Sequence, residues 1–332
     1  MTPTLLVSSQ ASGGPRTVFV EDWAAAYGSP YLVQPDEPMT ADVELVEDGD
    51  RLVAHPGVPP AREAEIAFVD GVRRGEASLY QYRPATGTVA HGVAGGHACG
   101  AVLGDGQMLR FGERRVRRLV IWGSGLTGVL PPVRGGWSWV SASVASAAPD
   151  APLKELQTRM REDEGRLAEE LCEGGYLVVI DGPLNFVRSR DLPVVGYVKT
   201  HYRALLPEEH HRRIPELQAG ERTSLFRLGA DRYSCYLRLT MRGATSSPWF
   251  GIVRLEVPQS SGLSAAVEVT NRVAGAIPRF AGVAHRDPRA PQNLQPIGAL
   301  ETHLRHLLGH AGLAARAVRE AVDALISSEE AS

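Results

Sequence analysis

Short apolar runs that end in an acid occur at two places in the chain. In "YLVVIDGPL", residues 176–184, four of the first five residues are aliphatic, and the run ends in Asp181 followed by Gly182. The segment "EIAFVDGV", residues 65–72, repeats this pattern and ends in Asp70-Gly71. Such runs predict strands buried on both faces. A carboxylate at the end of a buried strand is costly unless a cation meets it.

The clearest helical pattern is "LKELQTRMREDEGRLAEELCEGG", which predicts a helix of about 20 residues closed by two glycines. Its apolar stripe consists of Leu153, Leu156, Met160, Leu167 and Leu171. Acids occupy the gap in that stripe. At about 100° per residue, Asp163 and Glu164 flank the stripe, whereas Glu162 points nearly the opposite way. The face expected to pack on the sheet therefore carries an acid.

The rest of the pattern favours an α/β protein with a mixed sheet. Residues 77–140 alternate apolar and polar positions between turn signals, which predicts β-hairpins or a short meander. Further strands are expected at 194–202, 233–241 and 249–257, a polar helical stretch at 206–218, a helix near 261–275, and a long final helix from near Pro296 to about 326.

No internal repeat and no convincing domain boundary interrupts this order. We expect an N-terminal extension over residues 1–60, with partner or dimer contacts as its candidate role. One domain is expected over 61–326, with a β-rich insertion at about 77–140, followed by a flexible tail at 327–332.

Composition narrows the function classes. Hydrophobic content of 43% and charged content of 22% are ordinary for a soluble protein. The net charge of −3 does not indicate binding to nucleic acid or to an anionic membrane. No signal peptide and no stretch of roughly 18 apolar residues is found, so a cytoplasmic protein is expected. Cys99, Cys172 and Cys235 lie far apart, which argues against a disulfide framework and a zinc cluster.

The candidate chemistry rests on carboxylates. Asp70 and Asp181 are expected at the ends of two buried strands, with Glu164 on the helix beside them. Three unpaired acids repel one another, which suggests that a divalent cation neutralises them. Oxygen ligands without His or Cys favour Mg²⁺ or Mn²⁺ over zinc, and such a site suits phosphodiester cleavage. The competing interpretation is that each Asp-Gly pair only forms a turn.

Two other motifs are weaker evidence for a function. The segment "WGSGLTG", residues 122–128, satisfies GxGxxG, but the two prolines that follow forbid the helix that a dinucleotide site needs. The arginines of "RFGERRVRRL" can grip phosphates or can form a solvated strand edge, and both interpretations stay open.

Several motifs together resemble the NurA nuclease family. They are, in chain order, "FVDGV", "MREDEGRLAEEL", "VVIDGPL", "GYVKTHY" and "PQNLQPIGALETHL", and they span about residues 64 to 310. The resemblance implies a ribonuclease H-like core with a mixed central sheet flanked by helices. It also implies a manganese-dependent DNA nuclease, with Mg²⁺ as the alternative ion. The family works with the hexameric translocase HerA in resecting DNA ends.

Carried over by motif, the resemblance makes Asp70 and Asp181 metal ligands. Glu164 before "RLA" fits the helical glutamate better than Glu162, in agreement with the stripe. Lys199 in "GYVK" matches a lysine placed for phosphate, and Arg254 is a weaker candidate for a DNA phosphate contact.

The last motif departs from the family pattern. "PIGALE" places Glu301 where the family has His or another ligand, so Glu301 is expected to complete the site. Its alternatives are a solvated Glu301 early in an amphipathic helix, and His303 as the ligand instead.

The resemblance implies 5′-to-3′ degradation of single-stranded DNA with some endonuclease activity, and a nucleoid-associated homodimer docked on HerA. Two rivals remain from the sequence. One is a HerA-docking or DNA-end-binding subunit that keeps the fold with little cleavage, and the other is a metal-dependent hydrolase of small phosphoesters.

Overall fold

The computed structural model describes residues 43–59, 65–83, 88–104, 108–188, 192–200, 204–244 and 246–330. The chain divides into two compact units, one formed by residues 1–61 and 195–295 and the other by residues 62–194 and 296–332. Most of the expected N-terminal extension and the last two residues of the expected tail lie outside the described residues. The domain boundaries expected from the sequence stay a prediction.

The unit of residues 62–194 and 296–332 is built on a mixed sheet in the order β7-β3-β4-β5-β6. Its strands are β3 (Ile66–Arg83), β4 (Thr88–Gly104), β5 (Leu109–Trp122), β6 (Val140–Ser143) and β7 (Leu177–Asp181). The three long strands β3, β4 and β5 run antiparallel, whereas β7 joins β3 and β6 joins β5 in parallel. The expected α/β class with a mixed sheet is confirmed.

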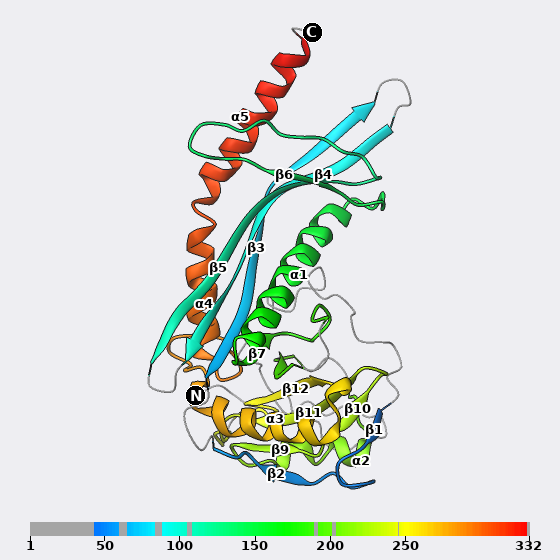
Figure 1. Cartoon of the computed structure of the whole chain (residues 1–332), viewed down its shortest axis with the longest axis vertical. Coiled ribbons are helices and arrows are strands. Elements are labelled where there is room, and N and C mark those ends of the chain that lie inside the picture. The colour runs from blue at the N-terminus through cyan, green and yellow to red at the C-terminus, as the bar shows by residue number, and fades with distance from the viewer. Residues whose placement is uncertain are drawn as a thin grey trace, which may run out of the picture. The chain divides into compact units, whose positions relative to one another are not determined.

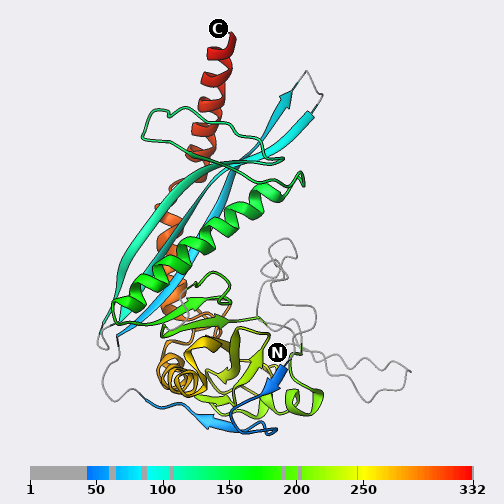
Figure 2. The ribbon, with the colours of Figure 1, turned by 45° about the vertical axis from the view of Figure 1, so that its right-hand side comes forward.

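Helices cover both faces of this sheet (Figure 1). They are α1 (Ala151–Glu173), α4 (Gln295–Leu307) and α5 (Ala311–Glu330). Figure 2 shows α1 on one face, with α4 and α5 on the other. Strand β4 meets both layers, because a Cβ on Gly95 would lie 2.9 Å from Leu156 of α1 and one on Gly100 would lie 3.2 Å from Leu304 of α4. Since neighbouring residues of a strand point to opposite faces, odd-numbered positions here face α1 and even-numbered ones face α4.

Two expectations about this unit are wrong. The run at 65–72 does not end at Asp70-Gly71, because β3 continues to Arg83 and places Asp70 inside the strand. The long final helix is interrupted: α4 ends at Leu307, and Gly309 adopts φ +74 before α5 begins. Arg74 and Arg118 each donate to the Leu308 carbonyl oxygen at 3.0 Å, which satisfies a group that a continuous helix would have bonded.

The unit of residues 1–61 and 195–295 contains antiparallel strands in the order β1-β10-β11-β12-β8. These are β1 (Val43–Leu45), β8 (Val194–Val198), β10 (Phe226–Leu228), β11 (Arg232–Arg238) and β12 (Ile252–Pro258). The short strands β2 (Ala54–Pro56) and β9 (Glu221–Thr223) pair with each other, and β9 also pairs with β11. The expected helix near 261–275 is α3 (Leu263–Ala276), whereas the polar stretch at 206–218 forms only the four-residue α2 (Glu208–His211) and a 3-10 turn.

Candidate metal centre

Asp70 lies inside β3, on the face of the sheet that α4 covers. It pairs directly with Gly100 of β4, so the two positions share a face. The side chain of Asp70 is 3% exposed. Its position within a strand rules out the turn interpretation for this Asp-Gly pair, since Gly71 is itself a strand residue.

Asp181 is the last residue of β7, as expected from the sequence. The next residue, Gly182, adopts φ +103, a conformation that side chains rarely allow, so the chain turns sharply after the acid. Strands β3 and β7 are parallel, and Val69 pairs with Ile180. Asp70 and Asp181 are the next residues of the two strands, so their side chains point to the same face of the sheet.

Glu301 of α4 completes a group of three carboxylates with Asp70 and Asp181. One oxygen from each residue lies within 4.8 Å of the other two. Ligands on opposite sides of Mg²⁺ lie about 4 Å apart, because each bond measures about 2.1 Å. Small side-chain movements therefore bring these oxygens to the spacing that a hard divalent cation needs. Glu301 is 6% exposed, so it is not the solvated residue of the competing interpretation.

His303, the alternative to Glu301, lies apart from this group. Its ring stacks on Phe111 of β5, with ring centroids 4.3 Å apart. Nη2 of Arg305, one helical turn further along α4, lies 3.4 Å from Oε2 of Glu301.

Glu164 approaches from the other face of the sheet. It lies on α1 and is fully buried. A Cβ on Gly71 would lie 2.3 Å from Glu164 Oε1, so the carboxylate occupies the space that the glycine leaves open. The three acids on the α4 face and Glu164 on the α1 face are thus separated by the strand layer, which the sequence did not indicate.

Arg161, three residues before Glu164 on α1, is the ion partner of that glutamate. Its Nη1 atom donates to Glu164 Oε2 at 2.8 Å and to the Asp181 carbonyl oxygen at 2.8 Å. Glu164 Oε1 has no hydrogen-bond partner among the described residues. Burial raises the pKa of Glu164 despite the opposing charge of Arg161. A buried carboxylate oxygen without a partner suits a cation. Glu164 nevertheless lies outside the group of three, so the fit to a divalent metal ion rests on the oxygens of Asp70, Asp181 and Glu301.

Asp163, the neighbour of Glu164, is bound elsewhere. Its Oδ2 atom lies 2.8 Å from Nε2 of the buried His97 in β4, and 3.0 Å from Nε of Arg117. Arg166 also pairs with it. Burial alone would raise the pKa of Asp163, but the hydrogen bonds from His97 and Arg166 lower it to about 2. Sequence reasoning missed this network and missed Arg161, although the i, i+3 spacing of Arg161 and Glu164 on a helix was a usable signal.

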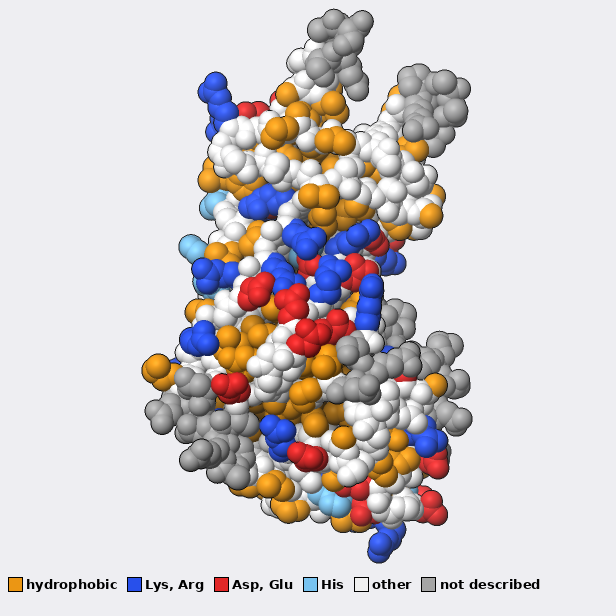
Figure 3. Space-filling model, in the orientation of Figure 1, with side chains coloured by type: hydrophobic (Ala, Val, Ile, Leu, Met, Phe, Trp, Pro, Cys, Tyr) orange, Lys and Arg blue, Asp and Glu red, His pale blue; other side chains and the backbone are white. Residues whose placement is uncertain are grey.

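Glu162, the alternative helical ligand, is half-buried and is not part of the group formed by Asp70, Asp181 and Glu301. Charged side chains of both signs are mixed over the face that carries α1 (Figure 3). The surface on this face is therefore not uniformly acidic.

The two predicted phosphate contacts belong to the other unit. Lys199 follows β8 and donates from Nζ to Asn293 Oδ1 at 2.9 Å. Arg254 of β12 is 3% exposed, and its Nη2 atom donates to Glu256 Oε1 at 2.8 Å. Their roles toward phosphate stay predictions.

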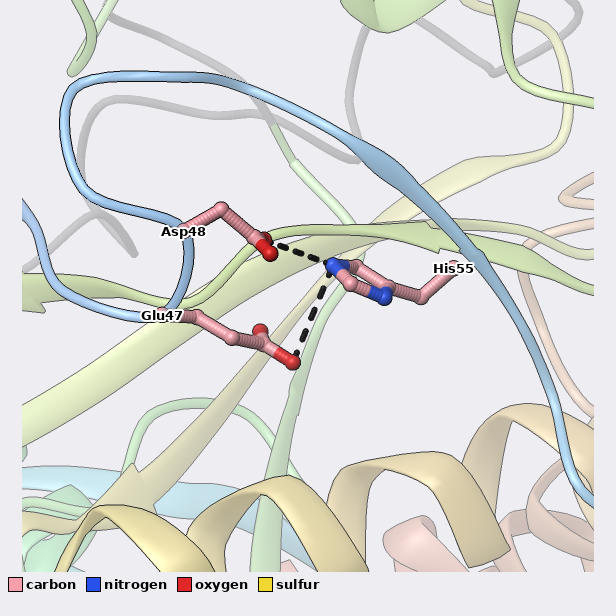
Figure 4. Close-up of side chains that lie close together, drawn as sticks. All are labelled: Glu47, Asp48 and His55. Atoms are coloured by element: carbon pink, nitrogen blue, oxygen red, sulfur yellow. Dashed lines mark hydrogen bonds and ion pairs between the residues drawn. The ribbon is translucent and has the colours of Figure 1, made fainter.

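A second group of metal-ligand side chains occurs in that unit: Glu47, Asp48 and His55 (Figure 4). Nε2 of His55 lies 2.7 Å from Asp48 Oδ2 and 3.7 Å from Glu47 Oε1. Both oxygens of Glu47 also accept from the guanidinium of the buried Arg222 at 2.7 Å. Because that cation already pairs with Glu47, the group is explained as a link between the segment before β2 and strand β9.

Among the described residues, no helix is both long and apolar enough to cross a membrane. No protein-family model matches the sequence, and no curated protein matches it. Among solved structures, the chain is similar to the crystal structure of the NurA nuclease from Sulfolobus solfataricus, with a TM-score of 0.44 and 9% sequence identity. The match covers 82% of this chain and 87% of that chain.

Proposed function

We propose that the protein is a divalent-cation-dependent nuclease of the NurA kind that cleaves DNA. The observation that carries this proposal is the convergence of Asp70, Asp181 and Glu301, from two strands and a helix, on one buried position. Oxygen ligands of this type favour Mn²⁺ or Mg²⁺, and Mn²⁺ is the ion that the sequence resemblance implies.

The role of the chain is to hold ligands and substrate in place. Asp70 and Asp181 project from strands that pair in the same sheet, so their backbone positions are held at a constant spacing. Glu164 lies on the α1 face and outside the group of three carboxylates, so its role as a further ligand is proposed from the sequence resemblance alone. Asp70, Asp181 and Glu301 would hold the divalent cation, which would supply an acidified water and neutralise charge on the departing oxygen. Lys199 is proposed to steady the scissile phosphate, and Arg254 remains the weaker candidate for a phosphate contact.

The finer proposals follow the sequence resemblance. They are 5′-to-3′ degradation of single-stranded DNA with endonuclease activity, action at duplex ends together with a HerA-like hexameric translocase, and a homodimer in the cytoplasm. We also propose, from the same resemblance, that the core is ribonuclease H-like.

The test is cleavage of a 5′-labelled single-stranded oligonucleotide in Mn²⁺, Mg²⁺ or chelator. The wild type is compared with Asp70→Asn, Asp181→Asn, Glu301→Gln, Glu164→Gln and Glu162→Gln. We expect cation-dependent cleavage that falls by about a hundredfold or more when a ligand is changed. Glu162→Gln is the matched control, because it removes the same charge two residues from Glu164 and should leave the rate nearly unchanged.

Other outcomes point to the rival functions. No cleavage in any metal, even with the translocase and ATP, would reject the nuclease and favour a docking or DNA-end-binding subunit. Cleavage of a small chromogenic phosphodiester but not of the oligonucleotide would favour a phosphoesterase. Activity that survives Asp181→Asn would place the chemistry at another site.

A further inference from the structure

Arg161 lies on α1, beside Glu164 and the last residue of β7. It donates to Glu164 Oε2 and to the Asp181 carbonyl oxygen from the same nitrogen, each at 2.8 Å. Burial alone would lower the pKa of Arg161, but the nearby carboxylates, Glu164 first and then Asp181 and Asp70, raise it above its ordinary value. The side chain thus already compensates part of the negative charge that would attract a cation.

A permanent positive charge here opposes any divalent cation that enters. A guanidinium does not lose its proton in proteins, so Arg161 cannot relieve this repulsion by deprotonation. The repulsion between unit charges a few ångströms apart is substantial at a partly buried site. It falls further if Arg161 acquires a second anion beside Glu164.

A second guanidinium makes such an anion favourable. Arg73 of β3 faces the α1 side, where its Nε atom donates to Gln157 Oε1. Burial lowers the pKa of Arg73, and the charge of Arg161 lowers it further. Two neighbouring guanidinium groups favour a bound phosphate, whose oxygens match their planar donors. The side chain of Arg161 is 27% exposed, so a phosphate can reach it from solvent.

We propose that Arg161 binds a phosphate of the substrate and thereby makes the binding of phosphate and divalent cation cooperative. The inference rests on the proposed nuclease function and names a residue for it. Without substrate, the charge of Arg161 weakens cation binding at the carboxylates. With a phosphate on Arg161, that charge is neutralised and the cation binds more tightly. By linkage, the cation strengthens phosphate binding by the same factor.

The experiment measures the dissociation constant of Mn²⁺ by electron paramagnetic resonance of the free ion. Each variant is titrated alone and with a phosphorothioate single-stranded oligonucleotide, which resists cleavage. For the wild type we expect Mn²⁺ to bind about tenfold more tightly when the oligonucleotide is present. For Arg161→Gln we expect Mn²⁺ alone to bind several-fold more tightly than to the wild type, with little further gain from the oligonucleotide.

Two variants make the result specific. Arg159→Gln removes a charge from the same helix, where Arg159 is 45% exposed and pairs with Glu155, and should behave like the wild type. Arg161→Lys keeps the charge without the planar donors, so Mn²⁺ alone should bind as in the wild type and the gain from the oligonucleotide should shrink. Unfolding temperatures and circular dichroism establish that each variant is folded. If Arg161→Gln does not fold, the comparison of Arg161→Lys with the wild type tests the proposal.

The contrary results separate this inference from the proposed function. Weaker binding of Mn²⁺ alone by Arg161→Gln would mean that the arginine only holds Glu164 in place. An unchanged gain from the oligonucleotide would place the phosphate elsewhere. Either result overturns the role of Arg161 while leaving the metal centre standing. If the wild type binds no Mn²⁺, or Asp70→Asn binds it equally well, the metal centre fails and the inference fails with it.

Discussion

At the scale of single residues, a missing side chain is what admits Glu164 to the sheet. Gly71 lies in regular β3 structure, and a Cβ there would come within 2.3 Å of Glu164 Oε1 and 2.9 Å of Met160 Cγ. We expect Gly71→Ala to lower the free energy of unfolding by about 1–3 kcal/mol, because a packed core cannot absorb the added carbon. Urea denaturation measures this change.

Gly75→Ala is the matched control for that prediction. Gly75 lies on the same strand, and a Cβ there would meet only ordinary contacts, the nearest at 3.5 Å from Leu153. We expect its effect to stay within about 0.5 kcal/mol. Equal losses in the two variants would show that any alanine disturbs β3, and that Gly71 has no special relation to Glu164.

Asp163 illustrates how a buried acid near the site is held ionised. Its pKa is lowered to about 2, so it stabilises the folded protein above its ordinary pKa near 4. This contribution is lost as the pH falls from about 4 through about 2, where the folded form takes up the proton. We expect Asp163→Asn to lower the free energy of unfolding by about 2 kcal/mol at pH 7.

The pH dependence distinguishes this effect from a packing defect. The difference between wild type and Asp163→Asn should shrink below about pH 4 when denaturation is followed across that range. Asp150→Asn, which removes an exposed partner of Lys154, should leave the stability nearly unchanged. A difference that is constant with pH would contradict the ionised pair.

At the scale of elements, one buried ion pair ties the segment before β2 to strand β9. Glu47 accepts from both terminal nitrogens of Arg222 and from the backbone N–H of Leu225, at 2.7 and 2.8 Å. We expect Glu47→Ala to lower the free energy of unfolding by about 3 kcal/mol or more, because it leaves the charge of a fully buried arginine without its carboxylate. Chemical denaturation tests this.

Glu44→Ala is the natural comparison, since Glu44 pairs with Arg227 at the same 2.7 Å but both side chains are exposed, at 66% and 41%. Its loss should be under about 1 kcal/mol. If the two variants cost the same, burial of Arg222 does not decide the strength of the pair.

The same scale shows how far sequence patterns reach. The helix at 151–173 and the strand ending at Asp181 follow from periodicity and flanking glycines, which are local signals. The length of β3 was not predictable from the apolar run at 65–72, because pairing with β4 sustains a polar, partly exposed strand beyond it. The break at Gly309 was missed for the same reason, since Arg74 and Arg118 from other strands satisfy the carbonyl there.

Local sequence patterns also predicted one part of the candidate site and missed another. The convergence of Asp70 and Asp181 was predictable because both follow buried apolar runs, and Glu301 because of its motif. The separation of Glu164 onto the opposite face depends on strand register, which no local pattern encodes.

At the scale of the whole molecule, the charge balance limits how the protein holds a polyanion on its own. The chain has 35 Lys and Arg against 38 Asp and Glu. Two of its arginines, Arg222 and Arg238, are buried and so are not available to phosphates. Few counterions can therefore be released when DNA binds.

We expect the isolated protein to bind a labelled single-stranded 20-mer with a dissociation constant no tighter than about 10⁻⁶ M near physiological salt. Affinity should fall further as salt rises, by about 0.7 logarithmic units per tenfold increase in salt for each phosphate neutralised. Fluorescence anisotropy between 50 and 200 mM salt, in chelator to prevent cleavage, measures both quantities. Nanomolar binding that does not change with salt would require a recognition surface other than scattered ionic contacts. A partner that adds basic surface would tighten the complex without any change in the metal centre, so the two contributions can be measured separately.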